Sequence, residues 1–466
     1  MTVVILGGGI GGLSAAHYLL KNTKHKILLL EASSRLGGWI RSEKQDNGLI
    51  FEQGPRTLRP KGESGANTLN LIEDLKLSDQ LKPILPSHAA SKNRYVYVNG
   101  KLHALPSSFS AIFKKLPPFS KPLINALVHD YKSPIKRIDD ESIYDFVERR
   151  FGKEIADYAI SPLICGVCGG DAKRISVRFL MKDLFDKEQN YGYVLKGLLW
   201  QLFQKKQRYH RGDLAKKAQR KEKWSSYAFQ NGMEVLPQTL AEEIEKSNVT
   251  VMKDSPVVKL SFKKKVISTE KEEIPFEHLI STIPSYTVGK LVRDEHYPMS
   301  KELLKIPYAS IITVNLAYSK KLLNIDGFGF LVPPSEQLPI LGIVFDSCYA
   351  PFEDWTVLTV MMGGHAFNSF FKDNCSEDYV LKTATKYVAD ILKIQSSPDV
   401  YKINVLRDCI PQQTIGHYHR VDSIESYAEF YNLPLYLVGT AYRGTGINDT
   451  ILSAKNAAQS IAKLNQ

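Results

Sequence analysis

The chain has 466 residues, of which 43% are hydrophobic and 24% are charged. At roughly 150 residues per domain, this length predicts two to four domains with buried cores. The ordinary globular composition excludes a disordered, collagenous or disulfide-scaffold protein. The formal net charge of +12 is compatible with a nucleic acid, an anionic membrane or an acidic substrate as partner.

A nucleotide-binding signature begins the chain. Thr2–Leu6 is a short, β-branched run that predicts the first strand of a parallel sheet. It is followed by GGGIGG at 7–12, which fits G-x-G-x-x-G, and by a predicted helix over 13–20. A second predicted strand, 26–30, ends at Glu31, where an acidic side chain can bind ribose hydroxyls. Strand, glycines, helix, strand and acid in this order predict a dinucleotide site.

Residues 35–41 read Arg-Leu-Gly-Gly-Trp-Ile-Arg and indicate which dinucleotide is bound. The segment resembles the R-x-G-G-R sequence that follows the second strand in flavin amine oxidase-like proteins, with Trp39 where the second Arg is frequent. There the glycines let the backbone lie against the FAD pyrophosphate and an Arg supplies charge. No second glycine pattern of this kind follows a strand, so FAD is predicted and a separate NAD(P)H domain is not.

A β-hairpin and a possible membrane contact come next. Arg94–Val98, the Asn99-Gly100 turn and Lys101–Ala104 predict the hairpin. Residues 105–128 then mix aromatic and aliphatic side chains with lysines around Pro117-Pro118, a pattern that suits an interfacial membrane contact; ordinary core helices are the alternative. Because no window reaches the roughly 18 apolar residues of a spanning helix and no leader is evident, we expect any membrane contact to be peripheral.

The five cysteines and the basic residues carry weaker signals. Cys165 and Cys168 form a C-x-x-C pair, which without a second pair or a histidine cluster indicates packed small residues rather than a zinc or redox site. Residues 201–225 contain nine basic and two acidic residues, so this segment supplies +7 of the net charge. They are Lys205, Lys206, Arg208, Arg211, Lys216, Lys217, Arg220, Lys221 and Lys223. The charge of this segment predicts contact with an anionic membrane or a solvated loop. Nucleic-acid binding is less favoured, because the segment lacks interleaved aromatic residues.

The C-terminal region repeats the strand, loop and helix pattern. Residues 434–439 predict a buried strand, 440–448 a glycine-containing loop and 449–464 a helix. If both ends of the chain contact one nucleotide, the FAD domain must be interrupted by long insertions.

Several segments resemble a narrower family. They are 7–13 with 31–42, 51–56, 93–98, 117–122, 327–333, 341–347, 360–364 and 438–449. Together they resemble the eukaryotic, oxygen-dependent protoporphyrinogen oxidases of the flavin amine oxidase-like superfamily, most of all the animal mitochondrial enzymes. The likeness runs in order over nearly the whole chain. Gly11, where the family often has Ser, and Cys168, where an aromatic is common, depart from it.

The resemblance implies an α/β (α+β multi-domain) architecture. A Rossmann-type FAD-binding domain would comprise 1–85, 208–285 and 405–466, with a mostly helical membrane-associating insertion at 86–207 and a mixed-sheet substrate domain at 286–404. The implied FAD contacts are Gly7, Gly8, Gly9, Ile10, Gly11, Gly12, Glu31, Arg35, Gly38, Trp39, Gly54, Pro55, Arg56, Thr57, Val257, Tyr442, Ile447, Asn448 and Asp449. The implied substrate contacts are Arg94, which would pair with a propionate, and the apolar wall of Phe328, Gly329, Leu331, Val344 and Met361.

The implied activity is oxidation of protoporphyrinogen IX to protoporphyrin IX in haem biosynthesis, by O2 in three two-electron cycles that each give H2O2. No side chain stands out as a catalytic acid or base, and no metal is expected. The resemblance also implies an anionic membrane surface on the intermembrane-space side of the mitochondrial inner membrane, a homodimer and contact with ferrochelatase, but no nucleic acid. The alternatives are a coproporphyrinogen III oxidase of bacterial type, another FAD-dependent amine oxidase, or a flavin-stabilised scaffold.

Overall fold

The computed structural model describes residues 1–201, 209–349, 352, 354–444 and 446–464, and it divides into two compact units. The first unit contains 1–83, 209–307 and 417–466, and the second contains 84–208 and 308–416. Residues 286–307 therefore belong to the first unit and 405–416 to the second. The predicted separation of a helical insertion from a substrate domain, both of which fall largely in the second unit, stays a prediction.

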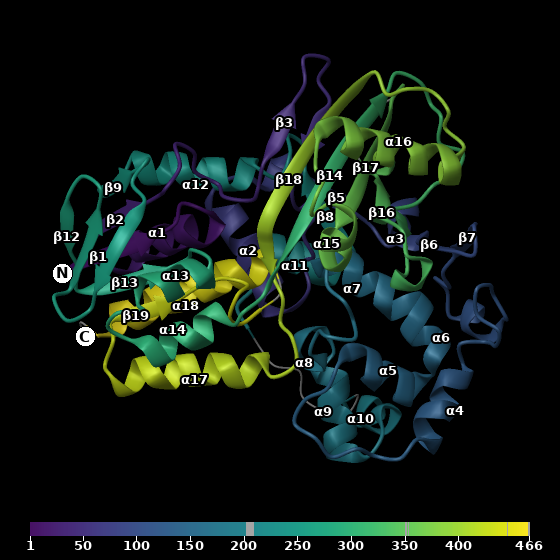
Figure 1. The fold of residues 1–466 in the computed structure, drawn as a ribbon, viewed down its shortest axis with the longest axis horizontal. Helices are drawn as coiled ribbons and strands as arrows, with labels where there is room; N and C mark the ends of the chain where they lie inside the picture. Colours follow the sequence, from purple (N-terminus) through teal and green to yellow (C-terminus); the bar gives the residue numbers. More distant parts are fainter. Residues whose placement is uncertain (202–208, 350–351, 353, 445, 465–466) are drawn as a thin grey trace. The chain divides into compact units, whose positions relative to one another are not determined.

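The first unit contains a parallel sheet with strand order β19-β13-β1-β2-β9 (Figure 1). Its strands are β1 (Thr2–Leu6), β2 (Lys26–Leu30), β9 (Val249–Met252), β13 (His278–Ser281) and β19 (Leu435–Leu437). Smaller sheets are formed by β3 (Ser42–Lys44) with β4 (Ile50–Glu52), β5 (Leu81–Ile84) with β8 (Ser226–Phe229), and β10 (Val257–Ser261) with β11 (Val266–Thr269) and β12 (Glu273–Pro275). The helices are α1 (Ile10–Asn22), α2 (Gly62–Asp74), α11 (Asp213–Lys216), α12 (Val235–Glu245), α13 (Ser285–Leu291), α14 (Tyr297–Leu304), α17 (His417–Phe430) and α18 (Ile447–Lys463).

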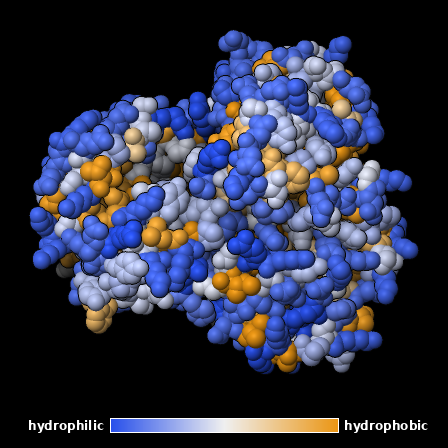
Figure 2. Space-filling view, viewed as in Figure 1, coloured by the Kyte–Doolittle hydropathy of each residue, from blue (hydrophilic) through white to orange (hydrophobic). Residues whose placement is uncertain are grey.

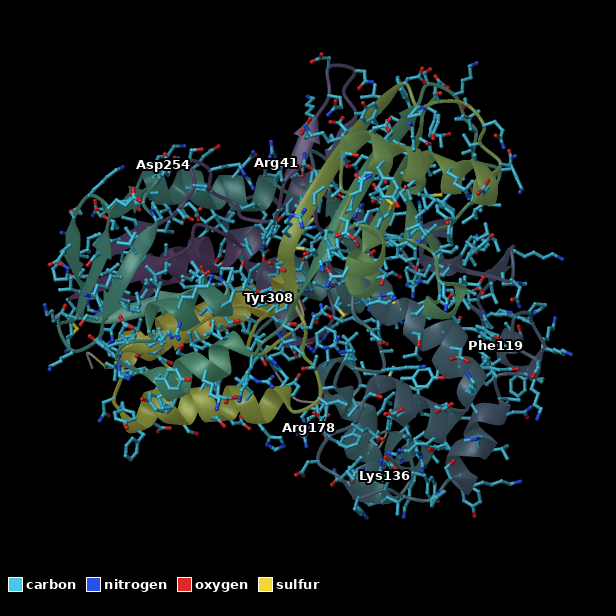
Figure 3. The ribbon with its side chains drawn as sticks, in the orientation of Figure 1. Arg41, Phe119, Lys136, Arg178, Asp254 and Tyr308 are labelled. Atoms are coloured by element: carbon cyan, nitrogen blue, oxygen red, sulfur yellow. The ribbon has the colours of Figure 1, made fainter. Side chains whose placement is uncertain are left out.

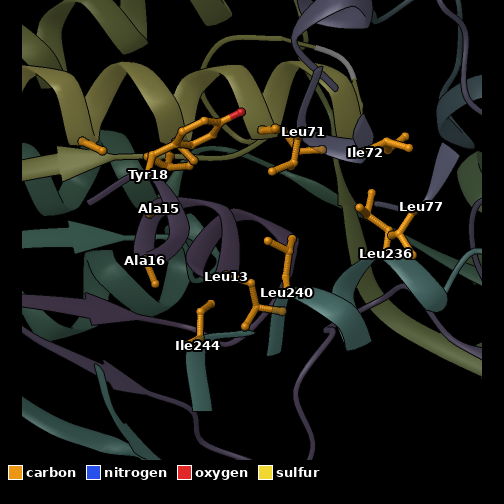
Figure 4. Packing of buried hydrophobic residues seen from close by; sticks show 14 of the residues in the cluster. Leu13, Ala15, Ala16, Tyr18, Leu71, Ile72, Leu77, Leu236, Leu240 and Ile244 are labelled. Carbon is orange, nitrogen blue, oxygen red and sulfur yellow. The ribbon is translucent and has the colours of Figure 1, made fainter. Parts of the chain in front are cut away.

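The core of the first unit forms around α1, which packs against α12 on one side and α18 on another. Figure 4 shows Leu13 of α1 beside Leu240 of α12, and Ala16 beside Ile244. All four side chains are buried, and removing this apolar surface from water contributes about 25 cal/mol per Å². This packing fixes the N-terminus of α1 at the end of β1, where the glycine-rich segment lies.

The second unit is built on a mixed sheet with strand order β18-β14-β17-β16-β15-β6-β7, in which only the β15–β6 pair is parallel (Figure 1). Its strands are β6 (Tyr95–Val98), β7 (Lys101–Ala104), β14 (Tyr308–Tyr318), β15 (Gly329–Leu331), β16 (Ile340–Phe345), β17 (Thr356–Gly363) and β18 (Val400–Pro411). Its helices are α3 (Ala89–Lys92), α4 (Asn125–Lys132), α5 (Ile143–Phe151), α6 (Lys153–Ile155), α7 (Ser161–Cys168), α8 (Val177–Leu180), α9 (Lys182–Tyr191), α10 (Val194–Gln201), α15 (Phe367–Phe370) and α16 (Glu377–Leu392).

One face of this mixed sheet is covered by α16. Ile312 and Val314 of β14 pack with Val380 and Ala384 of α16 in one buried cluster. Because successive strand residues point to opposite faces, the residues between them, Thr313 among them, belong to the other face. That second face carries four of the predicted substrate residues.

The helices between β7 and β14 are joined by buried ion pairs. Arg150 and Asp130 are fully buried, and Arg150 Nε donates to Asp130 Oδ1 at 2.7 Å. Arg149 Nη2 donates to Glu188 Oε2 at 2.6 Å. These bonds connect α4, α5 and α9. Charges so buried are tolerated because each is paired and hydrogen-bonded.

Candidate functional site

The glycine-rich segment leaves no room for a side chain at Gly7, Gly8 or Gly12. Gly7 has φ +96°, and its N–H donates to Leu30 O at 2.8 Å. A Cβ on Gly12 would lie 1.9 Å from the carbonyl oxygen of Gly7. The turn between β1 and α1 therefore requires glycine at these positions. It precedes the first N–H groups of α1, which have no carbonyl partner within the helix and favour a phosphate.

Glu31 is held at the end of β2 beside this turn. Its Oε2 accepts a hydrogen bond from the Gly8 N–H at 2.7 Å, and its Oε1 accepts two, from the Ser33 N–H at 2.8 Å and the Ser33 hydroxyl at 2.7 Å. Because a carboxylate oxygen has two lone pairs, Oε2 keeps acceptor capacity for a ribose hydroxyl. Val257 follows Ser255, whose N–H donates to Glu31 O at 2.9 Å. The start of β10 is thus close to Glu31, as the sequence-based assignment of both residues requires.

The loop after Glu31 lies against the glycine turn. Gly37 N–H donates to Gly8 O at 2.8 Å, and a Cβ on Gly38 would lie 3.1 Å from the Cα of Gly9. Arg35 donates to the carbonyl oxygens of Leu36 and Gly38 and pairs with Glu234 at 2.8 Å. Arg35 therefore shapes this loop through the protein itself, and its contact with the cofactor stays a prediction.

Trp39 and the segment 54–57 extend this site. Trp39 is 51% exposed. A Cβ on Gly54 would lie 2.4 Å from the carbonyl oxygen of Trp39. Gly54, which begins the predicted segment of Gly54, Pro55, Arg56 and Thr57, therefore lies against the loop that contains Trp39. Arg56 donates to Gly54 O at 3.1 Å and is buried.

The two ends of the chain meet at this site. A Cβ on Gly11 of α1 would lie 3.2 Å from Cγ2 of Thr450 in the first turn of α18. Ile447 begins α18, and Asp449 fills the space that a Cβ on Gly444 would need, at 2.4 Å. The starts of α1 and α18 are therefore adjacent. Thr445, which belongs to the predicted loop, lies outside the described residues.

Tyr442 and Asn448 connect the C-terminal segment to its surroundings. The carbonyl oxygen of Tyr442 is bonded to Nε2 of His417 at 3.0 Å. Asn448 Nδ2 donates to Arg59 O at 2.8 Å, whereas its Oδ1 is buried without a hydrogen-bond partner among the described residues. A buried, unbonded oxygen costs roughly 1–3 kcal/mol. A cofactor group that donates to it would remove this cost.

These observations fit FAD. The glycine turn is a cradle that a Cβ would fill, two helix N-termini are adjacent, and the Asn448 oxygen has no donor within the described part of the chain. No cluster of potential metal ligands occurs among the described residues.

Four of the predicted substrate residues lie on the face of the mixed sheet that α16 does not cover, namely Gly329, Leu331, Val344 and Met361. Cross-strand neighbours form two adjacent rows: Lys402, Asn315, Thr359, Val344 and Gly329, then Asn404, Thr313, Met361, Gly342 and Leu331. Each row is polar towards β18 and apolar towards β15. The face is thus divided into a polar half and an apolar half.

The apolar half is shaped by glycine and by α7. Gly329 has φ +139°, and a Cβ there would lie 2.2 Å from Ile343 O. A Cβ on Gly166 of α7 would lie 2.5 Å from Leu331. Phe328, Val344 and Met361 belong to one apolar cluster with the buried Tyr349. The structure therefore brings the predicted wall residues together in one unit.

Arg94 lies next to this wall. The predicted hairpin is present as β6 and β7, and Asn99 and Gly100 both have positive φ. Asn93 O accepts from Phe328 N–H at 3.1 Å, and Arg94 O accepts from Leu105 N–H at 2.8 Å. Arg94 is exposed just before the first residue of β6.

No catalytic acid or base is identified. The side chains of Phe328, Leu331, Val344 and Met361 carry no titratable group. Burial raises the pKa of the Cys168 thiol to about 11 and also raises the pKa of Cys165, so both remain neutral thiols. Both are buried within α7.

The sequence interpretation missed Asp346 and Tyr349. They follow β16 and lie behind the wall: the ring of Tyr349 stacks on Phe328 with centroids 5.9 Å apart. Phe345-Asp346-Ser347 lay within a family-like segment, but no local pattern assigned Asp346 a partner.

A glycine-rich β-α-β turn with an acidic second strand, on a parallel sheet, defines a nucleotide-dependent oxidoreductase fold. The chain belongs to the flavin containing amine oxidoreductase family, whose model matches residues 10–462. It is 38% identical to a protoporphyrinogen oxidase from Bos taurus, covering 98% of this chain and 97% of that one. It is 36% identical to a protoporphyrinogen oxidase from Homo sapiens, covering 99% and 98%. A crystal structure of a putative protoporphyrinogen oxidase from Exiguobacterium superposes with a TM-score of 0.81 at 24% identity, covering 100% and 99%.

Proposed function

We propose that this protein oxidises protoporphyrinogen IX to protoporphyrin IX with O2, using FAD, in haem biosynthesis. The observation that carries the proposal is the identity of 36–38% to protoporphyrinogen oxidases over almost the full length of both chains. The overall reaction balances: six electrons and six protons leave the macrocycle, and three O2 become three H2O2.

The first unit holds the cofactor. The N–H groups at the start of α1 would bind the pyrophosphate, Glu31 would accept from the ribose, and the loop around Gly38 and Trp39 would contact the cofactor. When bound, FAD supplies the two-electron acceptor that O2 reoxidises. Asn448 Oδ1 accepts a hydrogen bond from the cofactor.

The second unit binds and orients the substrate. Phe328, Leu331, Val344 and Met361 pack against the apolar macrocycle, and the lack of a side chain at Gly329 permits close approach. Arg94 pairs with a propionate through the two parallel bonds that a guanidinium favours. With no base in the wall, the macrocycle N–H protons pass to water.

We also propose that the protein contacts an anionic membrane peripherally, on the intermembrane-space side of the mitochondrial inner membrane. Among the described residues, the structure contains no helix with the length and apolar character of a membrane span. Phe109 is 79% exposed and Phe113 52%, and the packed helices α4 and α10 expose Tyr131 and Trp200. Apolar side chains with lysines beside them suit an interfacial contact.

Exposed apolar side chains are also visible on the surface of this helical part. Figure 2 shows small orange, apolar groups separated by blue, hydrophilic ones around the positions of α4, α9 and α10. Figure 3 labels Phe119 and Lys136, which lie in the connections before and after α4; Phe119 is buried against Tyr158, and Lys136 Nζ lies 3.9 Å from Glu141 Oε2. Of the basic segment, Lys205, Lys206 and Arg208 lie outside the described residues. A homodimer and contact with ferrochelatase remain expectations from the resemblance.

The function is tested with purified, FAD-loaded protein and three substrate types. We expect porphyrin fluorescence to develop rapidly from protoporphyrinogen IX, much more slowly from coproporphyrinogen III, and no oxidation of primary or secondary amines. The four carboxylates of coproporphyrinogen would require more cations than Arg94 provides at the apolar wall. Preferred oxidation of coproporphyrinogen or of an amine would replace the proposal with that alternative.

A further inference from the structure

Behind the apolar wall, one aromatic ring supports another. Phe328 and Tyr349 stack with ring centroids 5.9 Å apart and planes inclined by 19°. Tyr349 is buried and follows the short 3-10 helix η6 (Asp346–Cys348). Its hydroxyl donates to Asp346 Oδ1 at 2.6 Å. The ring that supports Phe328 is therefore fixed at its far end by a carboxylate.

The carboxylate is itself fixed by two strands. Asp346 Oδ2 accepts from Thr359 Oγ1 at 2.6 Å, and Thr359 Oγ1 accepts from Asn315 Nδ2 at 2.8 Å. All of these groups are buried. Thr359 is the cross-strand neighbour of both Asn315 and Val344. The bonded series thus extends from β14 through β17 to the wall.

This arrangement fixes orientation rather than adding packing. A phenylalanine at position 349 would fill the same space and stack equally on Phe328. The hydroxyl adds a directional bond to a buried acceptor at 2.6 Å. Loss of the acceptor would leave the Tyr349 and Thr359 hydroxyls without this partner in the interior, which is costly. The rotamer of Tyr349, and with it the angle of Phe328, is thereby restricted.

We propose that Asp346 is a positioning residue for the substrate wall, which acts through Tyr349 to hold the ring of Phe328 against an apolar macrocycle. The inference rests on the proposed function, because Phe328 contacts substrate only in that proposal. Asp346 acts on substrate binding and has no part in the electron transfer. Its removal therefore raises KM while kcat changes little.

The test compares FAD-loaded wild type, Asp346→Ala, Asp346→Asn and Tyr349→Phe in steady-state oxidation of protoporphyrinogen IX. Asp346→Ala should raise KM about tenfold, with kcat within about twofold of wild type. Asp346→Asn, which keeps an acceptor oxygen, should restore part of the affinity, and Tyr349→Phe should raise KM less than Asp346→Ala. In the Tyr349→Phe background, Asp346→Ala should raise KM by a smaller factor than in wild type, since the two residues act through one bond.

A matched control separates positioning from stability. Val360 lies on the same strand as Thr359 but points into the cluster that α16 covers. Val360→Ala should lower Tm and leave KM unchanged. An unchanged KM in the Asp346 and Tyr349 variants, or an equal rise in Val360→Ala, overturns the inference. If Asp346→Ala does not fold, the KM values of Asp346→Asn and Tyr349→Phe test the inference instead. Wild-type protein that leaves protoporphyrinogen unoxidised removes the proposed function and this inference together, whereas active wild type with unaltered variants removes this inference alone.

Discussion

The backbone N–H of Gly8 donates to Glu31 Oε2 at 2.7 Å, which joins the glycine turn to the end of the second strand. The bond fixes the carboxylate at the place where a ribose is expected. Asp254, labelled in Figure 3, holds the residues that follow Glu31: its N–H donates to Ser33 O at 3.1 Å. Glu31 therefore has a structural role in this turn, and its contact with the ribose is the prediction tested next.

We expect Glu31→Ala to weaken FAD binding by about tenfold to a hundredfold, since a hydrogen bond to a charged group contributes roughly 1.5–3 kcal/mol. Glu31→Gln, which keeps one acceptor oxygen, should have a smaller effect. The Kd is measured by titrating flavin fluorescence. Glu242→Ala, which removes an exposed acid of α12 in the same unit, serves as the control. Equal Kd values for Glu31→Ala and Glu242→Ala would contradict the assignment.

Arg94→Ala should lower kcat/KM for protoporphyrinogen by about tenfold to a hundredfold, mainly through KM, because it removes a charge-assisted pair with a propionate. Arg94→Lys should recover part of the loss, since an ammonium keeps the charge without the fork geometry. Lys92→Ala, an exposed cation two residues away, should have little effect. An unaltered kcat/KM for Arg94→Ala would rule out its role.

Much of the fold could be predicted because its signals are local. The predicted strands at 2–6 and 26–30 are observed, the predicted helix over 13–20 is α1, and the hairpin at 94–104 is present with its Asn-Gly turn. Each depends on hydrophobic period or on residues that tolerate positive φ.

The parts that local sequence could not predict depend on distant pairings. Strand β6 pairs with β15, so that Tyr95 neighbours Phe330, and nothing near either residue specifies the other. The same holds for Arg35, whose ion pair with Glu234 makes it a loop-shaping residue. Asp346 gains its partners only when β14 and β17 are aligned in register.

Phe109→Glu combined with Phe113→Glu should reduce binding to cardiolipin-containing vesicles by at least about tenfold, because the substitutions replace apolar contact with like charge near an anionic surface. Binding is measured by flotation. Phe430→Glu is a matched control, since Phe430 in α17 is 78% exposed and Phe109 is 79% exposed. Equal flotation of the double variant and wild type would refute the membrane assignment of this segment.

Acidification should destabilise the protein below about pH 6.5 through His17. Burial lowers the pKa of His17 below its usual 6.5, although Glu243, 2.6 Å from Nδ1, opposes the shift. The unfolded chain then binds the proton more tightly, so the stability present above pH 6.5 is lost as the pH falls through the folded-state pKa. We expect Tm to fall between pH 6.5 and 5, and His17→Gln to reduce that slope. His419→Gln, at an exposed position, should leave it unchanged; an identical slope in His17→Gln would contradict the prediction.

The most direct measurement is the stoichiometry of oxidation by the purified yellow protein. With protoporphyrinogen IX and O2 we expect porphyrin fluorescence to appear together with about three H2O2 formed per porphyrin, at a rate proportional to bound FAD. Protein that contains FAD yet produces neither porphyrin nor H2O2 from protoporphyrinogen would contradict the account.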